Sequence, residues 1–340
     1  EPGDNVPTKV ENPKSVRIVK PVFDMLGTVP GYREIDISFW FLAFFTVFFA
    51  MIIGDGGYGL ILLVGTVASF VATKRKGRPP ALGQILLALL SVSTVVWGAI
   101  TGNWFGHAGF AELPFLSSLI IEPIAAQNEA SNFNVQWMCF VIGAAQLALA
   151  HSWNVLRELK SRPRVTALAE VGWFAVVIGL YFLVLQIVLG VEGGLPPFAF
   201  YLMGGGIAAV FLFSYQEEGQ NFFVGVLKAL ANFITVGLSG VSAFSDIISY
   251  IRLYAVGLAS LRIAESFNDM ATGVGDALGG VPGIAAAALI LVLGHSLNLA
   301  MAALSVIVHG VRLNMLEFSG HLGMEWTGVP YTPFQKHRTA

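Results

Sequence analysis

Long apolar runs occupy most of the chain, and they constrain its fold more than any other feature of the sequence. An α-helix needs about 20 apolar residues to cross a hydrocarbon core about 30 Å thick, and the runs recur at close to that length. Charged residues make up 12% of the sequence, about half of the share typical of a soluble domain. The sequence therefore predicts an all-α integral membrane protein with eight transmembrane helices. We place them near residues 38–54, 58–73, 82–101, 133–155, 166–189, 198–215, 228–270 and 283–318.

Lysine and arginine are distributed unevenly between the connections of these helices. All but three of the 19 basic residues lie before the first run or after the second, fourth, sixth and eighth runs. The connections 102–132, 190–197 and 271–282 contain neither lysine nor arginine. Because basic loops remain on the cytoplasmic side of a membrane, both termini are predicted to be cytoplasmic. The domains are then a cytoplasmic linker at 1–37, a membrane domain at 38–318 and a cytoplasmic C-terminal tail at 319–340.

The last two runs are longer than a membrane crossing requires. At 1.5 Å per residue, a helix over 228–270 would measure roughly 65 Å and one over 283–318 roughly 54 Å. Splitting either run would move the basic C-terminal tail to the other side and break the charge pattern. We therefore expect two long, strongly tilted helices, with residues 216–227 along the membrane interface before the first of them.

Three basic residues, Arg252, Arg262 and Arg312, lie inside these long runs. A charged side chain at the centre of a membrane helix costs about 2.5–3.5 kcal/mol on insertion scales, and such residues generally face protein or water. Polar residues at helical spacing accompany Arg252 and Arg312 along one face of each helix. They are Ser239, Ser242, Asp246 and Ser249 on the first helix, and His295, Asn298, Ser305 and His309 on the second, where Ala302 occupies the intervening position of the same face.

The predicted orientation assigns the polar residues to opposite sides of the membrane, as two offset half-channels. Arginine keeps its proton at physiological pH, so Arg252 and Arg312 would separate the two paths as fixed charges. A carboxylate arriving within about 4 Å of a guanidinium would have its pKa lowered by about three units and would release its ion. The cytoplasmic half-channel is predicted to contain Ser239, Ser242, Asp246, Ser249, His309, Asn314 and Glu317, and the external one Glu265, Ser266, Asp269, His295 and Asn298.

Purely structural roles are the alternative for each of these residues. Serine in a membrane helix commonly bonds to the carbonyl group four residues earlier. The arginines would then serve as internal ion pairs, Arg252 with Asp246, Arg312 with Glu317, and Arg262 with Glu265 or Asp269.

Other features argue against nucleotide or cofactor binding by this chain. The stretch GDGGYG at 54–59 fits a tight turn between two helices rather than a dinucleotide fingerprint, because no strand precedes it. The sequence has no phosphate-binding loop and no histidine spacing typical of a metal site, so we predict no nucleotide, cofactor, metal or nucleic acid. His107 and His151 lie near the ends of runs and are expected at the membrane interface. The single cysteine, Cys139, excludes an internal disulfide framework.

Three stretches resemble a known family. SDIISYIRLYAVGLAS and GHSLNLAMAALSVIVHGVRLNMLEFSGH are similar to the last two membrane helices of the stator subunit, called subunit a or I, of rotary V-type and A-type ATPases. VPGYREIDISFWFLAFFTVFFAMIIGDGGYGL is similar to the entry of that subunit into the membrane. The resemblance covers essentially the whole chain, without the family's cytoplasmic N-terminal arm, which residues 1–37 would join.

The resemblance implies a function for the two central arginines. Arg252 and Arg312 would face the carboxylates of a rotating ring of proteolipid subunits, and H⁺ or Na⁺ would reach and leave the ring through the half-channels. The chain would bind no nucleotide, because ATP hydrolysis or synthesis takes place in a separate soluble sector reached through peripheral stalk subunits. Ala302 stands where eukaryotic relatives carry a glutamate, so Glu265, Asp269 or His295 would serve the external path. The membrane would be a prokaryotic plasma membrane.

Two other classes of protein remain open from the residues alone. A self-contained secondary transporter would use the Arg–Asp and Arg–Glu pairs as its own ion site, and such folds commonly show internal repeats and broken helices. A membrane scaffold would use the buried charges only to orient its helices. Neither alternative explains the polar faces of the two long helices as directly as the half-channels do.

Overall fold

The computed structural model describes residues 6–32 and 34–331. Its regular structure is helical apart from β1 (Pro7–Thr8) and β2 (Val329–Pro330), which pair in parallel. These residues form two compact units. Arg33, Lys336 and Arg338, which contribute to the predicted orientation, lie outside the described residues, as does the end of the C-terminal tail at 332–340.

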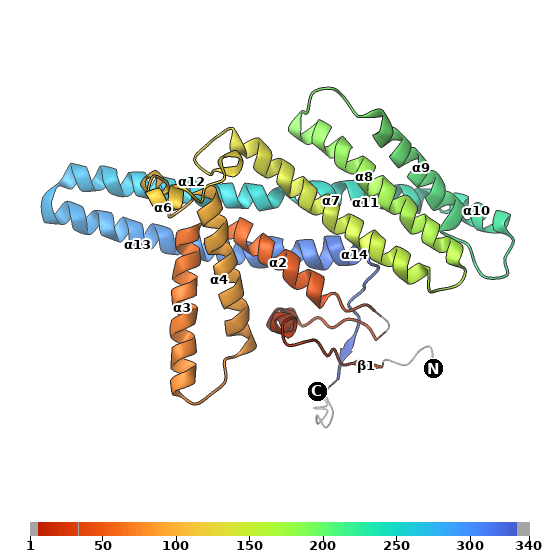
Figure 1. The fold of residues 1–340 in the computed structure, drawn as a ribbon, viewed down its shortest axis with the longest axis horizontal. Helices are drawn as coiled ribbons and strands as arrows, with labels where there is room; N and C mark the ends of the chain where they lie inside the picture. Colours follow the sequence, from red (N-terminus) through yellow and green to blue (C-terminus); the bar gives the residue numbers. More distant parts are fainter. Residues whose placement is uncertain (1–5, 33, 332–340) are drawn as a thin grey trace. The chain divides into compact units, whose positions relative to one another are not determined.

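The first unit comprises the described residues up to Leu119, Ser260–Val306, and those from Gly323 onward. In Figure 1, α3 and α4 form an antiparallel pair, and α12 and α13 form another. The helices of this unit are η1 (Arg17–Val19), α1 (Lys20–Leu26), α2 (Ser38–Ile53), α3 (Gly56–Arg75), α4 (Leu82–Thr101), α5 (Ala108–Ala111), α6 (Pro114–Ser117), most of α12 (Ile251–Leu278) and α13 (Gly280–Ser305).

A tight turn connects α2 to α3, as the GDGGYG stretch predicts. Gly54 ends α2 in the left-handed conformation, with φ 67°, which glycine adopts without steric cost. Asp55 Oδ1 accepts hydrogen bonds from the backbone N–H groups of Gly57 and Tyr58, at 2.7 and 3.1 Å, and so caps the start of α3. The turn brings the Tyr58 side chain into the interior of the unit, where it is 1% exposed.

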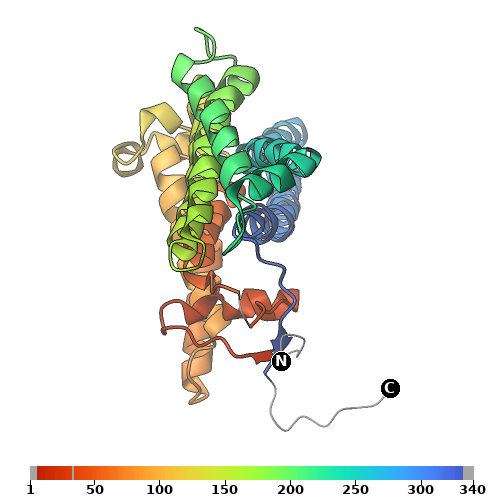
Figure 2. The same ribbon diagram turned by 90° about the vertical axis from the view of Figure 1, so that its right-hand side faces the viewer.

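The second unit comprises Ile120–Ala259 and Ile307–Leu322. Figures 1 and 2 both show α7, α8 and α9 running side by side. The helices of this unit are η2 (Glu122–Ile124), α7 (Ser131–Glu158), η3 (Arg164–Thr166), α8 (Ala167–Leu189), α9 (Pro197–Phe213), α10 (Phe222–Ala231), α11 (Phe233–Ser249), the first residues of α12, η4 (Val306–Gly310), η5 (Leu313–Phe318) and α14 (Ser319–His321).

Close helix packing forms the core of the second unit. Gly172 of α8 and Gly206 of α9 face each other, since a Cβ on either would lie 2.5–2.6 Å from the carbonyl oxygen of the other. Small residues allow such close approach of helices in membranes, where packing replaces the exclusion of water as the driving force. The buried apolar cluster beside this contact joins α7, α8 and α11 and consists of Phe140, Leu147, Val176, Val177, Leu180, Val184, Leu185, Ala243 and Ile247.

Six helical stretches in the described part of the chain are long and apolar enough to cross a membrane. They are Gly56–Arg75, Leu82–Thr101, Ser131–Glu158, Arg164–Leu189, Phe233–Leu278 and Gly280–His321. The prediction of an all-α, multi-pass membrane architecture is confirmed. The first and sixth predicted spans correspond to α2 and α9, apolar helices of only 16 and 17 residues. The number of eight spans and the side on which the termini lie therefore stay predictions.

The two longest stretches contain 46 and 42 residues, in agreement with the two long helices expected from the sequence. The connection between them is shorter than predicted. Residues 271–282 are not a loop, because α12 continues to Leu278 and α13 begins at Gly280. Gly279 and Gly280 turn the chain between them, with φ 61° and 51°. The glycines there serve packing instead, since a Cβ on Gly283 would lie 2.4 Å from the Gly275 carbonyl oxygen. At the other end, the predicted interfacial segment 216–227 overlaps the separate short helix α10.

The last helix changes its geometry after Ser305. The segments η4 and η5 are π-helices, in which hydrogen bonds join residues i and i+5 rather than i and i+4. The spacing of three and four residues that predicts one continuous polar face assumes an α-helix throughout. That spacing therefore applies as far as Ser305, and His309 lies in the π-helix η4 beyond it.

Candidate functional site

Arg252 and Arg312 both approach the carboxylate of Glu317. Arg252 Nη2 donates to Glu317 Oε1 at 2.8 Å, and Arg312 Nε lies 3.6 Å from the same oxygen. The Glu317 side chain is 4% exposed, whereas those of Arg252 and Arg312 are 24% and 57% exposed. Glu317 Oε2 is buried and has no hydrogen-bond partner among the described residues. One carboxylate thus faces two guanidinium groups, and these three side chains together carry one excess positive charge.

The π-helix η5 explains why Arg312 and Glu317 meet. Residues five apart in an α-helix lie on different faces, because neighbours on one face are three or four residues apart. In a π-helix, residue i+5 lies one turn above residue i. The local change of helix type therefore brings the Glu317 carboxylate to Arg312.

A fully buried hydrogen-bond chain holds the segments that carry this cluster. Tyr250 OH donates to Gln146 Oε1 at 2.8 Å, and Gln146 Nε2 donates to Asn314 Oδ1 at 3.0 Å. All three side chains are completely buried, and a Cβ on Gly143 would lie 2.6 Å from the Tyr250 ring. The chain ties α7 to the start of α12 and to η5, two residues from each arginine.

Asp246 and Ser249 of α11 lie beside the same cluster. Ser249 Oγ donates to the Asp246 carbonyl oxygen at 2.7 Å and lies 3.2 Å from Glu317 Oε1. The Asp246 carboxylate bonds to His321, with 3.1 Å between Oδ2 and Nε2. The alternative pairing of Arg252 with Asp246 is therefore replaced by a pairing with Glu317, which lies 65 residues away in the sequence.

The remaining residues of the predicted cytoplasmic half-channel are placed differently. Ser239 and Ser242 are exposed, and Ser239 Oγ donates to the Thr235 carbonyl oxygen of its own helix at 3.0 Å. His309 is half-buried, and its Nδ1 has no hydrogen-bond partner among the described residues. The structure thus places Asp246, Ser249, Asn314 and Glu317 near the arginines. The part of all seven residues in a cytoplasmic half-channel stays a prediction.

A second polar cluster, in the first unit, contains two residues of the predicted external half-channel. Tyr58 OH donates to His295 Nδ1 at 2.7 Å, and His295 Nε2 lies 3.0 Å from Asn268 Oδ1. Asn298 Nδ2 donates to Tyr58 OH at 3.0 Å and to the Ser260 carbonyl oxygen at 2.8 Å. With the proton of His295 on Nε2, every bond in this cluster has a donor and an acceptor and no member needs a charge.

The acidic residues of the predicted external half-channel lie on α12 with Arg262. Arg262 Nη1 bonds to Glu265 Oε2 at 2.9 Å, the i,i+3 pair that the sequence analysis considered. Ser266 Oγ donates to the Arg262 carbonyl oxygen at 2.7 Å, and Asp269 is exposed. Glu265 and Ser266 therefore contact Arg262 of their own helix, whereas His295 and Asn298 belong to the cluster around Tyr58.

Comparisons with known proteins bear on the whole chain. No protein-family model matches the sequence. It is 42% identical over 339 residues to V-type ATP synthase subunit I of Borreliella burgdorferi, covering 99% of this chain and 55% of that relative. The chain belongs to the family of V-type and A-type ATP synthase subunits I. Subunit I 1 of Treponema pallidum is 38% identical over 98% of the chain, and the A-type subunit I of Methanocaldococcus jannaschii is 27% identical over 99%.

The chain spans about half the length of these subunits I, from 50 to 55%. Several polar residues that build the two clusters do not stand out in the sequence. Gln146 is an isolated amide within an apolar run, Asn268 lies between the polar residues Ser266 and Asp269, and Tyr58 lies in the turn that was considered only as a connection. A lone amide inside an apolar run is the signal that points to a buried bond, because an unsatisfied amide is costly there.

His151 makes buried contacts that the sequence does not predict. Its side chain is 6% exposed and bonds to Glu170 and His321, and its expected position near the membrane interface stays a prediction. A histidine near the end of an apolar run reaches a buried partner when another helix presents a carboxylate at the same level. That information is absent from the run itself.

Proposed function

We propose that this chain forms the membrane part of the stator subunit of a rotary V-type or A-type ATPase. H⁺ or Na⁺ passes through two offset half-channels to and from the carboxylates of a rotating proteolipid ring, coupled to ATP hydrolysis or synthesis elsewhere in the complex. The chain itself binds no nucleotide. Peripheral stalk subunits join it through a cytoplasmic arm before residues 1–37. Eight spans, with the last two strongly tilted, and cytoplasmic termini in a prokaryotic plasma membrane complete the proposal.

The convergence of Arg252 and Arg312 on Glu317 is the observation that carries this function. Glu317 neutralises one guanidinium and leaves one positive charge on the cluster. Two unit charges 4 Å apart interact by about 4 kcal/mol at an effective dielectric constant near 20. A ring carboxylate that reaches the cluster therefore finds a positive charge that the chain's own acidic group has not cancelled, and it releases its ion as it pairs.

Family membership provides the second line of support. The relatives are named ATP synthase subunits I, and the similarity extends along nearly all of this chain. The polar residues divide between the charged cluster around Glu317 and the neutral cluster around Tyr58, which matches two separate paths better than a single site. We assign the first cluster to the cytoplasmic path and the second to the external path.

Replacement of Arg252 by glutamine in the full complex tests the proposal. ATP-driven ion uptake and ATP hydrolysis would be followed together in inverted membrane vesicles, after assembly has been confirmed. Glutamine keeps a hydrogen bond to Glu317 but removes the fixed charge, so uptake should disappear in an assembled complex.

Arg262→Gln is the matched control, since Arg262 is 53% exposed and pairs with Glu265 within its own helix. That variant should retain coupled uptake. Uptake near the wild-type rate in Arg252→Gln would show that Arg252 is structural and would contradict the proposed function. Ion transport by the purified chain alone would favour a self-contained transporter instead.

A further inference from the structure

Glu170, His151, His321 and Asp246 form a continuous hydrogen-bonded chain in the second unit. We propose that this series of hydrogen-bonded side chains is a proton relay that delivers H⁺ to Asp246, beside the arginine cluster. The proposal rests on the proposed function and deepens it, because it names H⁺ as the ion carried on this path.

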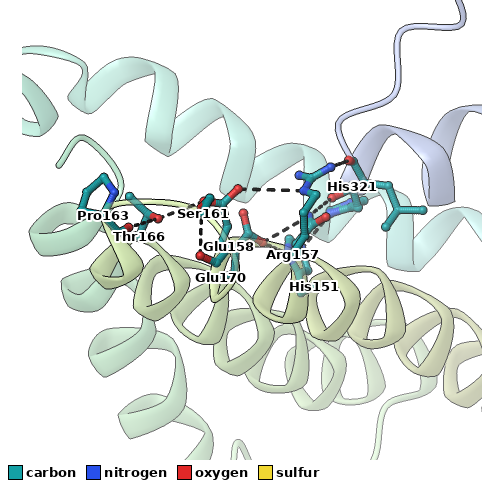
Figure 3. A network of polar contacts seen from close by, with 10 residues as sticks. His151, Arg157, Glu158, Ser161, Pro163, Thr166, Glu170 and His321 are labelled. Carbon is teal, nitrogen blue, oxygen red and sulfur yellow. Dashed lines mark hydrogen bonds and ion pairs between the residues drawn. The ribbon is translucent and has the colours of Figure 1, made fainter. Parts of the chain in front are cut away.

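The distances along the chain are those of hydrogen bonds at every step. Glu170 Oε2 lies 2.8 Å from His151 Nδ1, and His151 Nε2 lies 3.0 Å from His321 Nδ1. His321 Nε2 lies 3.1 Å from Asp246 Oδ2. Figure 3 shows His151 between Glu170 and His321. The four residues come from α8, α7, α14 and α11, so tertiary packing alone has aligned them.

Burial differs between the middle and the ends of the chain. The His151 and His321 side chains are 6% and 12% exposed, whereas those of Glu170 and Asp246 are 23% and 29% exposed. The two imidazoles are therefore shielded, and each terminal carboxylate has accessible surface. A path that takes up a proton at one end and gives it away at the other requires this arrangement.

Neighbouring side chains hold the imidazoles in line. Asn154 Nδ2 donates to the His321 carbonyl oxygen at 2.8 Å and lies 3.3 Å from Glu170 Oε2. The Trp173 ring stacks against the His151 ring, with 6.2 Å between centroids and 17° between planes. Arg157 Nη1 donates to the Leu322 carbonyl oxygen at 3.3 Å, so the nearby guanidinium fixes the end of α14 rather than joining the chain. Positioned donors and acceptors are what proton transfer needs.

The transfer balances as a shift of one proton through the chain. Protonated Glu170 donates to His151 Nδ1, and its O–H bond breaks as an N–H bond forms. The proton on His151 Nε2 passes to His321 Nδ1, and the proton on His321 Nε2 passes to Asp246, which becomes a carboxylic acid while Glu170 becomes a carboxylate. Each imidazole ends neutral in its other tautomer. The relay resets when each imidazole ring rotates and brings its proton back to the side facing the next member. Glu170 then takes up another proton.

A sodium ion does not fit this path. Hard cations such as Ca²⁺ and Mg²⁺ take several oxygen ligands around one centre, and Na⁺ has the same preference for oxygen. The inner members here are ring nitrogens arranged in line. Within residues 6–32 and 34–331, no group of three or more histidine, cysteine, aspartate or glutamate side chains could hold a metal ion. The geometry is that of a hydrogen-bonded wire.

Asp246 connects the relay to the charged cluster. Ser249, three residues further along α11, bonds to the Asp246 carbonyl oxygen and lies 3.2 Å from Glu317 Oε1. A proton on Asp246 is therefore held about one helical turn from Ser249, which contacts Glu317. Under the proposed function, it passes from there to a ring carboxylate that leaves the arginines and must be neutralised again.

Histidine variants of the full complex in inverted vesicles test the relay. His321→Gln keeps a donor and an acceptor but cannot exchange a proton between them, so ATP-driven H⁺ uptake should fall by about 100-fold. In His321→Ala, added imidazole should restore a large part of the uptake, because it supplies the missing ring. His107→Ala, which changes an exposed histidine outside the relay, should transport normally with or without imidazole. Uptake should also be independent of Na⁺.

Three outcomes would overturn the relay. These are near-normal uptake in assembled His321→Gln, a loss in His321→Ala that imidazole does not restore, and uptake that requires Na⁺. Should His321→Ala fail to assemble, His321→Gln still decides the matter by its uptake. Arg252→Gln in the same vesicles keeps the two proposals apart. If Arg252→Gln abolishes uptake while His321→Gln preserves it, only the relay is wrong, whereas normal uptake by Arg252→Gln contradicts the proposed function itself.

Discussion

The two polar clusters of this protein each centre on a buried side chain, Glu317 or Tyr58, but they differ in how their charges are satisfied. Around Glu317, two guanidinium groups share one carboxylate, and Glu317 Oε2 has no hydrogen-bond partner among the described residues. Around Tyr58, a phenol, an imidazole and two amides satisfy one another without any formal charge. The first arrangement is complete only when a further negative charge arrives, whereas the second is complete within the chain.

This difference separates an electrostatic role from a positioning role. A buried charge without a partner is costly, and fully satisfied polar networks instead stabilise one arrangement of the helices. We therefore expect changes at Glu317 to affect both stability and transport strongly, and changes at Tyr58 to affect mainly stability, with a smaller effect on transport through the proposed external path.

The largest effect should come from Glu317→Gln. Without the carboxylate, Arg252 and Arg312 face each other as like charges, and the free energy of unfolding should fall by about 3 kcal/mol, near the lower end for a broken buried pair because Arg312 is exposed. Urea unfolding in detergent micelles would measure it. Arg312→Gln added to Glu317→Gln should recover part of the loss by removing one of the charges. A loss below about 1 kcal/mol, or no recovery in the double variant, would show that the pair contributes little.

Asp55 should add a dependence on pH to the region next to Tyr58. Burial raises the pKa of the Asp55 carboxyl to about 6, although backbone N–H groups oppose the shift. The unfolded chain ionises at the ordinary pKa of about 4, so the folded state holds its proton more tightly between these values. Stability contributed by this group is therefore present below about pH 4, falls as the pH rises to about 6, and stays low above that.

Asp55→Asn should remove this dependence. The amide oxygen still caps α3 but does not titrate, so the variant should be more stable than the wild type above pH 6, by up to about 3 kcal/mol for a shift of about two pKa units. Thermal unfolding in detergent at pH 4, 6 and 8 would measure the difference. An equal difference at all three pH values would mean that the carboxyl is ionised throughout.

Tyr58→Phe should give the smallest effect of the three and sharpen the comparison between the clusters. The change removes the hydroxyl that bonds to His295 and Asn298, and leaving such groups unsatisfied costs about 1–3 kcal/mol. Urea unfolding would measure this loss against Tyr201→Phe, since Tyr201 is 79% exposed and should tolerate the change. Tyr58→Phe should lower ATP-driven uptake in the full complex only partly, because His295 and Asn298 of the proposed external path remain, and Tyr201→Phe should leave uptake unchanged. Unchanged uptake in an assembled Tyr58→Phe complex would contradict the assignment of the neutral cluster to the external path.

The contacts that the sequence analysis anticipated are local ones. Arg262 and Glu265 are three residues apart on a helix, and that spacing alone makes them neighbours. The turn at 54–59 follows from a glycine and a capping aspartate in adjacent positions. Arg312 and Glu317 were considered as a pair, but the reason that they meet is the π-helix, which the spacing of polar residues did not reveal.

The contacts that escaped prediction join residues far apart in the chain. Glu317 lies 65 residues from Arg252, and His321 lies 170 residues from His151. Periodicity along one helix reports which residues share a face, but it does not report which face of another helix they meet. The relay needs four segments to present side chains at one level, and no local pattern contains that condition.

By itself, the sequence determined that this protein is a helical, multi-pass membrane protein with two long helices carrying central arginines. Length and apolarity decide this locally, because every backbone group in lipid must be satisfied within its own segment. Only the tertiary structure decided which carboxylate faces the arginines, where the register changes to a π-helix, and how two histidines line up between Glu170 and Asp246. Those outcomes depend on the packing of segments against one another, where a shift of a few ångströms makes or breaks a hydrogen bond.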